Sequence, residues 1–426
     1  MNNKRYLFKA FMIVFITSFL FFYEFGLTNI YNSLGPYVVK DFNLSPTQFG
    51  FIASLFFYTD LLFLIPAGLL VDRYSPRRII TLVLLVSSTG VLLNANSHSL
   101  TMLIFARLLM GFGGGFCLVS CIRIAVNWFP SQYLAAISGF IITMGMLGGL
   151  MVQTPLTLLI IHTSWREALV IVAIIGYTIA ALIFLCVRDM PPERREELQG
   201  HIKKHHESGL IHCLKLALLK KQNWYCGFYT CLMNLPIFML GALLGIPYLT
   251  QVNQLTTTEA ATVSGMLYLG TMIGSPIMGW LSDTFKNRKL PMLINAVLAI
   301  VLVFIIIQIT SNNFWLLLGL FLLLGVITSA QIISYPTVVE SNSKMISSSA
   351  TCIISMMCMV SGAFIQPLAG FLLSIRGGQV IAGTMDYPIT SYHFVMNILP
   401  IAFIIAFIFA LLIRETHAKA LPDDPS

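Results

Sequence analysis

Long apolar runs recur along this chain from one end to the other, and they constrain its fold more than any other feature. A helix needs about 20 apolar residues to cross the hydrocarbon core of a bilayer. Runs of that length, separated by short polar segments, account for most of the 426 residues. Only 10% of the residues are charged, against about 25% in a soluble domain. The sequence therefore predicts an all-α, multi-pass membrane protein and excludes a soluble enzyme.

Twelve transmembrane helices in two pseudo-symmetric six-helix bundles are predicted from these runs and from the breakers between them. The N-terminal bundle covers 1–188, a cytoplasmic linker 189–222, the C-terminal bundle 223–413 and a cytoplasmic tail 414–426. The first run is too long for the core of a signal peptide, so we expect it to be retained. The predicted helices span 8–32, 47–71, 78–95, 101–126, 133–160, 165–188, 223–246, 258–282, 290–309, 313–337, 346–375 and 393–413.

Basic residues are distributed asymmetrically between the two sides of the membrane. Of the 25 Lys and Arg residues, only Lys40, Arg166 and Arg376 fall in segments on the side opposite the linker, and Arg107 lies within a span. The other 21 share the side of the linker, which the positive-inside rule places in the cytoplasm together with both termini. The net charge of +8 thus follows from topology, and we expect no nucleic-acid binding. We expect a monomer in a bacterial inner membrane, with the lipid bilayer and a small-molecule solute as partners.

Two similar segments reveal an internal repeat. Gly68-Leu-Leu-Val-Asp72-Arg73-Tyr-Ser-Pro-Arg77-Arg78 follows the second predicted helix, and Gly279-Trp-Leu-Ser-Asp283-Thr-Phe-Lys-Asn-Arg288-Lys289 follows the eighth. The Gly, the Asp and two successive basic residues recur at an offset of 211, and Gln153 and Gln366 recur at an offset of 213. Two bundles of like topology explain both offsets.

These motifs resemble those of the major facilitator superfamily of secondary transporters. The stretch from Gly68 to Arg78 is similar to that family's loop signature between its second and third helices, with Ser75 where Gly is usual. Arg107-Leu-Leu-Met-Gly111-Phe-Gly113 resembles its fourth-helix motif, and Ser164-Trp165-Arg166 resembles a common start of its sixth helix. The resemblance implies two six-helix bundles with a cavity that opens alternately to each side.

A narrower resemblance concerns the direction of transport. Tyr23-Glu24-Phe25, Phe56-Phe57-Tyr58 and Asn127-Trp-Phe-Pro130 resemble the phagosomal nutrient importers of intracellular bacteria, a branch associated with amino acids and nucleosides. These matches all lie in the first half of the chain. The Gly-Pro pair of the antiporter-type fifth-helix motif is missing at Gly145-Met146. Efflux of an amphipathic drug or metabolite stays an alternative, and a non-transporting sensor or scaffold is a minor one.

Three ionisable residues, Glu24, Asp60 and Arg107, lie within predicted spans, where such groups indicate function by default. Glu24 lies about 13 Å and Arg107 about 9 Å from the outer ends of their helices, at 1.5 Å per residue. Because these depths overlap, and because the resemblance implies that the first and fourth helices line the central cavity, we expect an ion pair between Glu24 and Arg107, which could couple protons to transport, hold the helices together or bind substrate. Asp60 is either a second proton site or a hydrogen-bonding partner of hydroxyls on a neighbouring helix.

Neutral polar residues at membrane depth are candidates for the lining of the solute cavity. Thr28 and Tyr31 share a face of the first helix with Glu24, as their spacing requires. Amides and hydroxyls also bond membrane helices to one another, so either role is open. The repeated position of Gln153 and Gln366 suggests broken helix segments there. The candidate cavity residues are Thr28, Tyr31, Gln153, Asn234, Gln331 and Gln366.

The repeated loop motif predicts a cytoplasmic gate. The resemblance implies that Asp72 and its basic neighbours, with their counterparts in the second half, latch the cytoplasmic side; mere determination of topology is the alternative. Glu340, at the inner end of the tenth helix, is a candidate partner for Arg288, and Arg123 is either a gate residue or snorkels to the interface. The predicted gate residues are Gly68, Asp72, Arg73, Arg77, Arg123, Gly279, Asp283, Arg288 and Glu340.

No pattern typical of catalysis or of a cofactor emerges. His201, His205 and His206 lie in the linker without Cys or carboxylate partners at a metal-binding spacing, so a solvated linker is preferred to a metal site. A Gly-x-x-x-x-Gly-Lys-Ser/Thr phosphate loop is absent. The sequence therefore predicts a transporter rather than an enzyme, with no metal or cofactor and H⁺ as the coupling ion, that imports an amino acid, a short peptide or a nucleoside.

Overall fold

A computed structural model describes residues 3–129, 131–191, 210–376 and 387–419, and the structural statements below concern these residues. Helices make up nearly all of them, no strand occurs in these four ranges, and eleven helices are long and apolar enough to cross a membrane. The all-α membrane fold predicted from the sequence is therefore confirmed. The linker histidines at 201, 205 and 206 lie outside the described ranges.

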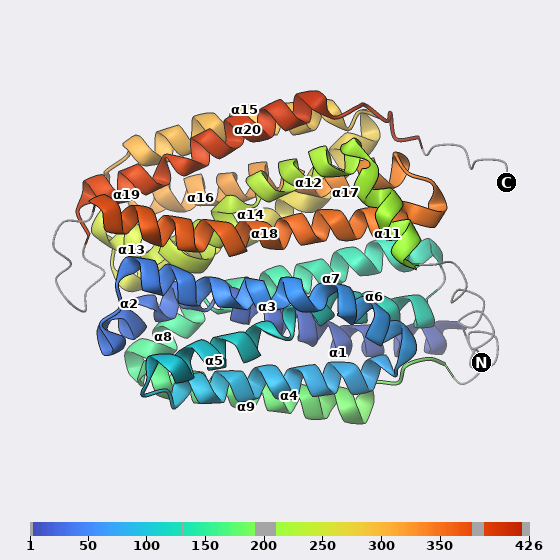
Figure 1. Cartoon of the computed structure of the whole chain (residues 1–426), viewed down its shortest axis with the longest axis horizontal. Helices are drawn as coiled ribbons and strands as arrows, with labels where there is room; N and C mark the ends of the chain where they lie inside the picture. The colour runs from blue at the N-terminus through green and yellow to red at the C-terminus, as the bar shows by residue number, and fades with distance from the viewer. Residues whose placement is uncertain (1–2, 130, 192–209, 377–386, 420–426) are drawn as a thin grey trace. The chain divides into compact units, whose positions relative to one another are not determined.

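Contacts between residues divide the chain into two compact units. The first comprises Met1–Tyr37 with Ile52–Glu207, and the second Val38–Phe51 with Ser208–Ser426. Within each unit, long helices run side by side (Figure 1). The segment 38–51, which the sequence places in the N-terminal bundle, thus belongs to the second unit. Within that unit, the Thr47 hydroxyl donates a hydrogen bond to that of Ser374 over 3.0 Å.

Six predicted spans correspond to nine helices in the first part of the chain. The fourth span is divided around Phe112-Gly113 and the fifth around Val152-Gln153. Ser75, Ser99 and Ser164 cap three of the helices, since each side chain accepts a bond from a backbone N–H in the first turn. The helices are α1 (Asn3–Asn29), α2 (Tyr31–Phe42), α3 (Pro46–Arg73), α4 (Pro76–Ala95), α5 (Leu100–Gly111), α6 (Gly114–Trp128), α7 (Ser131–Met151), α8 (Thr154–His162) and α9 (Trp165–Cys186).

The second part of the chain contains more irregular helices. Pro236, which lacks a backbone N–H, precedes a π-helical turn in the seventh span, and a 3₁₀ segment interrupts the tenth. α11 is a helix where the sequence predicts only a linker, and α14 matches the eighth predicted span without being among the eleven apolar helices. The elements are α11 (Leu210–Leu219), α12 (Lys221–Met233), η2 (Ile237–Leu244), α13 (Gly245–Gln251), α14 (Thr257–Thr284), α15 (Lys289–Gln308), α16 (Phe314–Thr328), η3 (Ser329–Ile333), α17 (Ser334–Glu340), α18 (Lys344–Arg376), α19 (Ile389–Met396) and α20 (Ile398–Leu412).

Equivalent helices pair in the same way in both units, in accord with the internal repeat. In the first unit α1 packs on α7 and α4 packs on α9. In the second unit the corresponding pairs are α12 with α18 and α15 with α20. The repeat therefore extends from two short motifs to two equivalent pairs of packed helices.

Small residues bring α5 and α6, the two parts of the fourth predicted span, into backbone contact with α3. A Cβ at Gly111 would meet the backbone of Phe56, with its Cα at 2.8 Å. A Cβ at Gly115 would meet the backbone N of Leu64 at 2.8 Å. The two glycines are four residues apart and lie on one face of the divided helix, as in other closely packed membrane helices. This contact fixes the position of Asp60, which lies between Phe56 and Leu64 on α3.

Candidate functional site

Two buried carboxyl groups lie beside the break between α5 and α6, the two parts of the fourth predicted span. Glu24 of α1 is fully buried, and Asp60 of α3 is 4% exposed. A Cβ at Gly113 would overlap the Glu24 carboxyl, and a Cβ at Gly114 would lie 2.7 Å from the Asp60 carboxyl carbon. Consecutive glycines at the start of α6 therefore provide the space that both carboxyl groups occupy.

Both carboxyl oxygens of Glu24 are buried, and neither forms a hydrogen bond of good geometry with a described residue. The Ser87 hydroxyl is the polar side-chain group nearest in effect to this carboxyl. Most buried polar atoms in folded proteins do have such a partner, and an ionised carboxylate in an apolar interior is strongly disfavoured. Glu24 is thus chemically suited to exchange a proton rather than to hold a fixed charge.

The predicted ion pair between Glu24 and Arg107 is wrong for this structure. Arg107 donates through Nη1 to the carbonyl of Leu27 over 2.9 Å, and through Nη2 to the carbonyls of Thr28 and Ala53 over 3.3 and 3.1 Å. α1 ends at Asn29, so the Leu27 and Thr28 carbonyls belong to its last turn, where carbonyls have no partner within the helix. These free carbonyls attract the guanidinium away from the carboxyl one turn earlier.

The predicted cavity face of α1 is also buried inside the first unit. Tyr31 is completely buried, lies over Arg107 at 4.3 Å from the ring centroid, and accepts a bond from the Asn94 amide over 3.1 Å. The Thr28 hydroxyl donates to the backbone carbonyl of Glu24 over 2.9 Å. α5 and α4 supply the contacts of Tyr31, and the Thr28 hydroxyl bonds within its own helix, so both side chains take part in packing in this structure.

Gln153 lies at the break between α7 and α8, as the sequence suggested for this position. Its side chain accepts a bond from the Asn32 amide over 2.8 Å, and the Ser33 hydroxyl donates to the carbonyl of Val152 over 2.7 Å. The repeat-related Gln366 lies in the unbroken helix α18 and donates to the carbonyl of Phe238 over 3.3 Å. A broken segment therefore accompanies only the first of the two glutamines.

A neutral polar cluster forms in the second unit, where the end of α12, the 3₁₀ segment η3 and α18 meet. Gln331 of η3 donates to the Asn234 side chain over 2.8 Å, and Asn234 donates to the Cys358 sulfur over 2.9 Å. Asn234 is the C-cap of α12, just before the π-helical turn, and Gln331 lies in the 3₁₀ segment η3, so each amide lies where its span departs from regular α-helix. Asn234 and Gln331 were separate candidates in the sequence, and the structure joins them. The second amide oxygen of the pair, on Gln331, is buried without a partner within the described chain.

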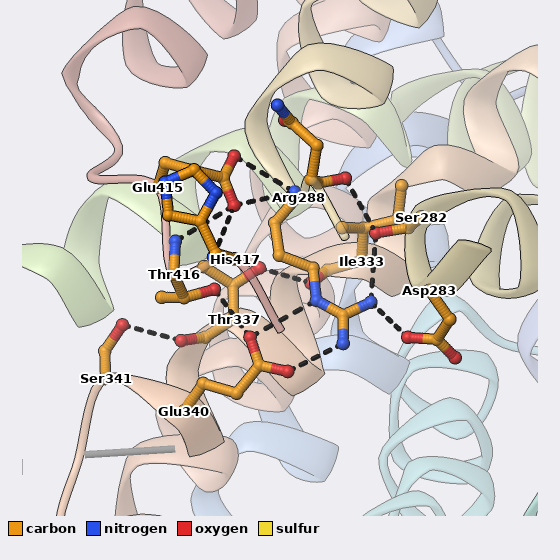
Figure 2. A network of polar contacts seen from close by, with 11 residues as sticks. Ser282, Asp283, Arg288, Ile333, Thr337, Glu340, Ser341, Glu415, Thr416 and His417 are labelled. Carbon is orange, nitrogen blue, oxygen red and sulfur yellow. Dashed lines mark hydrogen bonds and ion pairs between the residues drawn. The ribbon is translucent and has the colours of Figure 1, made fainter. Parts of the chain in front are cut away.

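The predicted pair of Arg288 and Glu340 is present in the second unit. Figure 2 shows the Arg288 guanidinium between two acidic side chains: Nη2 lies 2.6 Å from Glu340 Oε1, and Nη1 lies 2.6 Å from Asp283 Oδ1. Arg288 Nε also donates to Glu340 Oε2 over 3.2 Å. The two arms of this network differ in exposure, because the Glu340 side chain is 12% exposed and that of Asp283 is 66% exposed.

Two acidic residues that the sequence analysis missed complete both loop motifs. Asp189, three residues after α9, accepts bonds from the backbone N–H of Arg77 over 2.7 Å and from the Ser75 hydroxyl. Glu415, three residues after α20, accepts bonds from the backbone N–H groups of Arg288 and Lys289 over 2.9 and 2.7 Å (Figure 2). Each carboxylate thus binds the start of the third helix of its own half, α4 or α15. An acidic residue three positions beyond the last helix of each half is the sequence signal that could have found them.

Glu415 should contribute to stability only while it is ionised. Partial burial acts against the charge, but backbone N–H donors from Arg288, Lys289, His417 and Thr416 hold the pKa of Glu415 below its usual range. The contribution is therefore complete above the pKa of the unfolded chain, about 4.3, and is lost as the pH falls through the lower folded value. We expect Glu415→Gln to lower stability by about 0.5–1 kcal/mol at pH 7. Thermal unfolding in detergent at a series of pH values would check this; a difference that persists unchanged at pH 3 would contradict it.

The remaining gate candidates show fewer contacts. No atom lies within 4 Å of a Cβ built at Gly68 or at Gly279. Asp72 is the penultimate residue of α3, and its side chain lies outside what the structure describes. Arg73 is exposed beside the Tyr74 ring, and Arg123 is half-buried on α6.

Comparisons with known proteins agree with this architecture. The model of the Major Facilitator Superfamily matches residues 14–244 and 226–426. The hexuronate transporter of Bacillus subtilis is 26% identical over 249 residues, and the match spans 58% of this chain and 58% of that relative, less than two thirds of its length. MdtD of Salmonella newport, whose name assigns it provisionally to multidrug resistance, is 26% identical over 94% of this chain and 95% of its own.

A solved structure shows the same fold. A bacterial homologue of the human lysosomal transporter Spinster superposes with a TM-score of 0.78 at 16% identity, over 96% of this chain and 97% of that one. Since the family model covers nearly the whole sequence and the helix pattern repeats as in such transporters, the chain belongs to the Major Facilitator Superfamily of membrane transporters.

Proposed function

We propose that this transporter imports a small polar nutrient, such as an amino acid, a short peptide or a nucleoside, together with protons. The buried and unbonded carboxyl of Glu24, with Asp60 next to it, is the observation that supports proton coupling most directly. Loading a proton neutralises the carboxyl, which removes the penalty of keeping a charge in an apolar interior. Protonation therefore changes the stability of the packing between α1 and the glycines at the break between α5 and α6.

The solute would meet neutral donors and acceptors rather than fixed charges. Asn234 and Gln331 offer amide groups at the bends of two helices in the second unit, and one buried amide oxygen of Gln331 has no partner in the described residues. Amides can bind both the donors and the acceptors of a zwitterionic or hydroxylated solute. Gln366 is a further candidate, since its amide oxygen is likewise buried and unbonded there.

Glu24→Gln should abolish proton coupling. Because Gln cannot ionise, we expect proton-driven uptake to fall at least tenfold, an effect of about 1.4 kcal/mol or more, while solute exchange without a pH gradient persists. Proteoliposomes loaded with the pH dye pyranine would be given L-leucine, L-alanyl-L-alanine or uridine, and symport would acidify the lumen. Glu167→Gln is a matched control, since this acid lies in the first turn of α9, outside the site. Unchanged acidification by Glu24→Gln would refute the coupling role.

Proton-driven efflux is a second candidate, favoured by the relationship to MdtD over 94% of the chain. In that case internal ethidium would leave the proteoliposomes in exchange for external protons, and none of the three nutrients would change the luminal pH. The fifth predicted span lacks the Gly-Pro pair of the antiporter-type motif, which argues against this function. Its first part, α7, continues without a break through Gly145 and Met146.

A further inference from the structure

Two apolar grooves flank α15 in the second unit. The first has a volume of about 310 Å³, lies between α15 and α20, and includes Leu293, Val297 and Phe407 in its lining. The second has a volume of about 220 Å³, lies between the end of α14 and the start of α15, and is lined chiefly by apolar side chains such as Leu281. Ile294 lines both grooves and is 48% exposed, so it forms the ridge that separates them.

The second groove results from the way in which α14 and α15 diverge. α14 packs closely on α16, since a Cβ at Gly270 would lie 3.0 Å from the Cα of Gly325. α15 packs mainly on α20 instead, and the two lie side by side in Figure 1. The turn between α14 and α15 therefore opens into an angle that the described side chains leave unfilled. Tightly packed proteins contain few such voids, so in a membrane this space is filled from outside the chain.

Both grooves fit within one leaflet of a bilayer. α15 begins at Lys289, and Leu298 is the residue farthest along this helix that lines either groove. The two are nine residues apart, or about 13 Å at 1.5 Å per residue. Half of the hydrocarbon core of a bilayer measures about 15 Å. The grooves therefore begin at the end of the span and extend as deep as an acyl chain does.

A basic side chain lies at the mouth of the first groove. Lys289 Nζ donates to the carbonyl of Leu411, in the last turn of α20, over 2.5 Å. Leu293 lies one turn beyond Lys289 on the same face of α15, and Phe407 lies one turn before Leu411 on the same face of α20. The bond to Leu411 thus holds the ammonium directly over the lining of this groove. An ammonium has three donors, so two remain for another acceptor.

The charges around this mouth favour an anion. Lys286 and Arg414 are exposed, and within the described residues neither of them, nor Lys289, pairs with a carboxylate. Glu415 is the nearby acid, and backbone N–H groups, including those of Arg288 and Lys289, already bind its carboxylate. The positive-inside rule predicts that this end of α15 faces the cytoplasmic leaflet. Basic pockets between transmembrane helices on that side are typical binding sites for lipid headgroups.

We propose that the two grooves bind one anionic phospholipid, with an acyl chain on each side of Ile294 and the phosphate on Lys289. Two adjoining apolar grooves below one unpaired ammonium match the two chains and the single charge of such a lipid. An apolar helix of another protein would fill the grooves but would offer no anion to Lys289. α14, α15 and α20 all belong to the second unit, so this site is independent of the proposed proton coupling at Glu24.

Native mass spectrometry of the purified protein measures the binding of each lipid. The probes are palmitoyl-oleoyl phosphatidylglycerol, which is anionic, and phosphatidylcholine with the same chains. We expect the first phosphatidylglycerol to bind at least fivefold more tightly than phosphatidylcholine. Lys289→Gln should weaken phosphatidylglycerol binding about fivefold, the effect of about 1 kcal/mol per basic residue, and leave phosphatidylcholine unchanged. Ile294→Trp, which fills the junction of the grooves, should weaken the binding of both lipids at least fivefold.

Matched variants separate charge from fold. Lys289→Arg keeps the charge and should bind both lipids as the unmodified protein does. Lys221→Gln is the control, because this exposed lysine is likewise the first residue of its helix, α12, and lines neither groove. sn-Glycerol 3-phosphate, which has the phosphate but no chains, should not displace phosphatidylglycerol.

Three results would overturn the site. If Lys289→Gln lowered the affinity for phosphatidylglycerol no more than Lys221→Gln does, Lys289 would not bind the headgroup. Unchanged binding of both lipids by Ile294→Trp would place the acyl chains elsewhere, and displacement by sn-glycerol 3-phosphate would show a site for free phosphate. A dimer that dissociates in Ile294→Trp while the preference for phosphatidylglycerol persists would assign this face to a second copy of the chain.

Discussion

Gly111→Ala should be among the most destabilising single substitutions in this chain. The added methyl group would meet backbone atoms of Phe56 in α3, and backbone cannot move aside without shifting a whole helix. Overpacking of this kind costs about 1–3 kcal/mol and occasionally more, and we expect a value near the upper end. Separation of α5 from α3 should also displace Asp60 and stop transport. Thermal unfolding of the purified variant, together with its uptake activity, measures both effects.

Two other glycines sharpen this test. At Gly319, on α16, a Cβ would have nothing within 4 Å, so Gly319→Ala should be neutral or slightly stabilising. At Gly113 the three nearest atoms to a Cβ all belong to the Glu24 side chain, so the double variant Gly113→Ala/Glu24→Ala should recover most of the stability that Gly113→Ala loses. Equal losses of stability on substitution of all three glycines would mean that α5 and α6 do not pack as the structure shows.

Glu340→Gln should destabilise the second unit far more than Asp283→Asn. Removing one partner of a buried ion pair costs about 3–5 kcal/mol, because the other charge stays buried, and the Arg288 side chain is only 5% exposed. Remaining contact with water reduces our expectation to about 3 kcal/mol for Glu340→Gln. Asp283 is 66% exposed, and exposed pairs contribute about 0–1 kcal/mol.

A double variant isolates the pair itself. Arg288→Met/Glu340→Met replaces both charges with apolar side chains of similar length, and such exchanges are often neutral. We therefore expect the double variant to be more stable than either single one, as measured by thermal unfolding in detergent. If Asp283→Asn matched the loss caused by Glu340→Gln, the exposed arm of the network would carry the charge of Arg288, contrary to the geometry.

The sequence could predict features that depend on composition and on long-range repetition. Apolar runs of spanning length gave the helices, and the offset of 211 gave the equivalence of Asp72–Arg77 with Asp283–Arg288. The pair of Arg288 and Glu340 was predictable because both residues lie at helix ends, where charged side chains have few possible partners. End positions are fixed by topology alone.

Contacts in the middle of helices could not be predicted in this way. Arg107 and Glu24 matched in depth, but the end of α1 at Asn29 exposes carbonyls that a guanidinium prefers. The break between α5 and α6 at Phe112-Gly113 was likewise not predicted, and depth arithmetic assumes an unbroken helix. The meeting of Asn234 and Gln331 occurs beside a π-helical turn and within a 3₁₀ segment, two irregularities that no periodicity revealed.

The two carboxylates at Asp189 and Glu415 also bear on the order of events during synthesis. The start of α4 is complete only after the chain has grown from Arg77 to Asp189, and the start of α15 only after it has grown from Arg288 to Glu415. Domains of a growing chain fold in order from the N-terminus. The first half can therefore complete the start of α4 while the second is still being made, whereas the start of α15 has no Glu415 carboxylate to bind until the segment that follows α20 has left the ribosome.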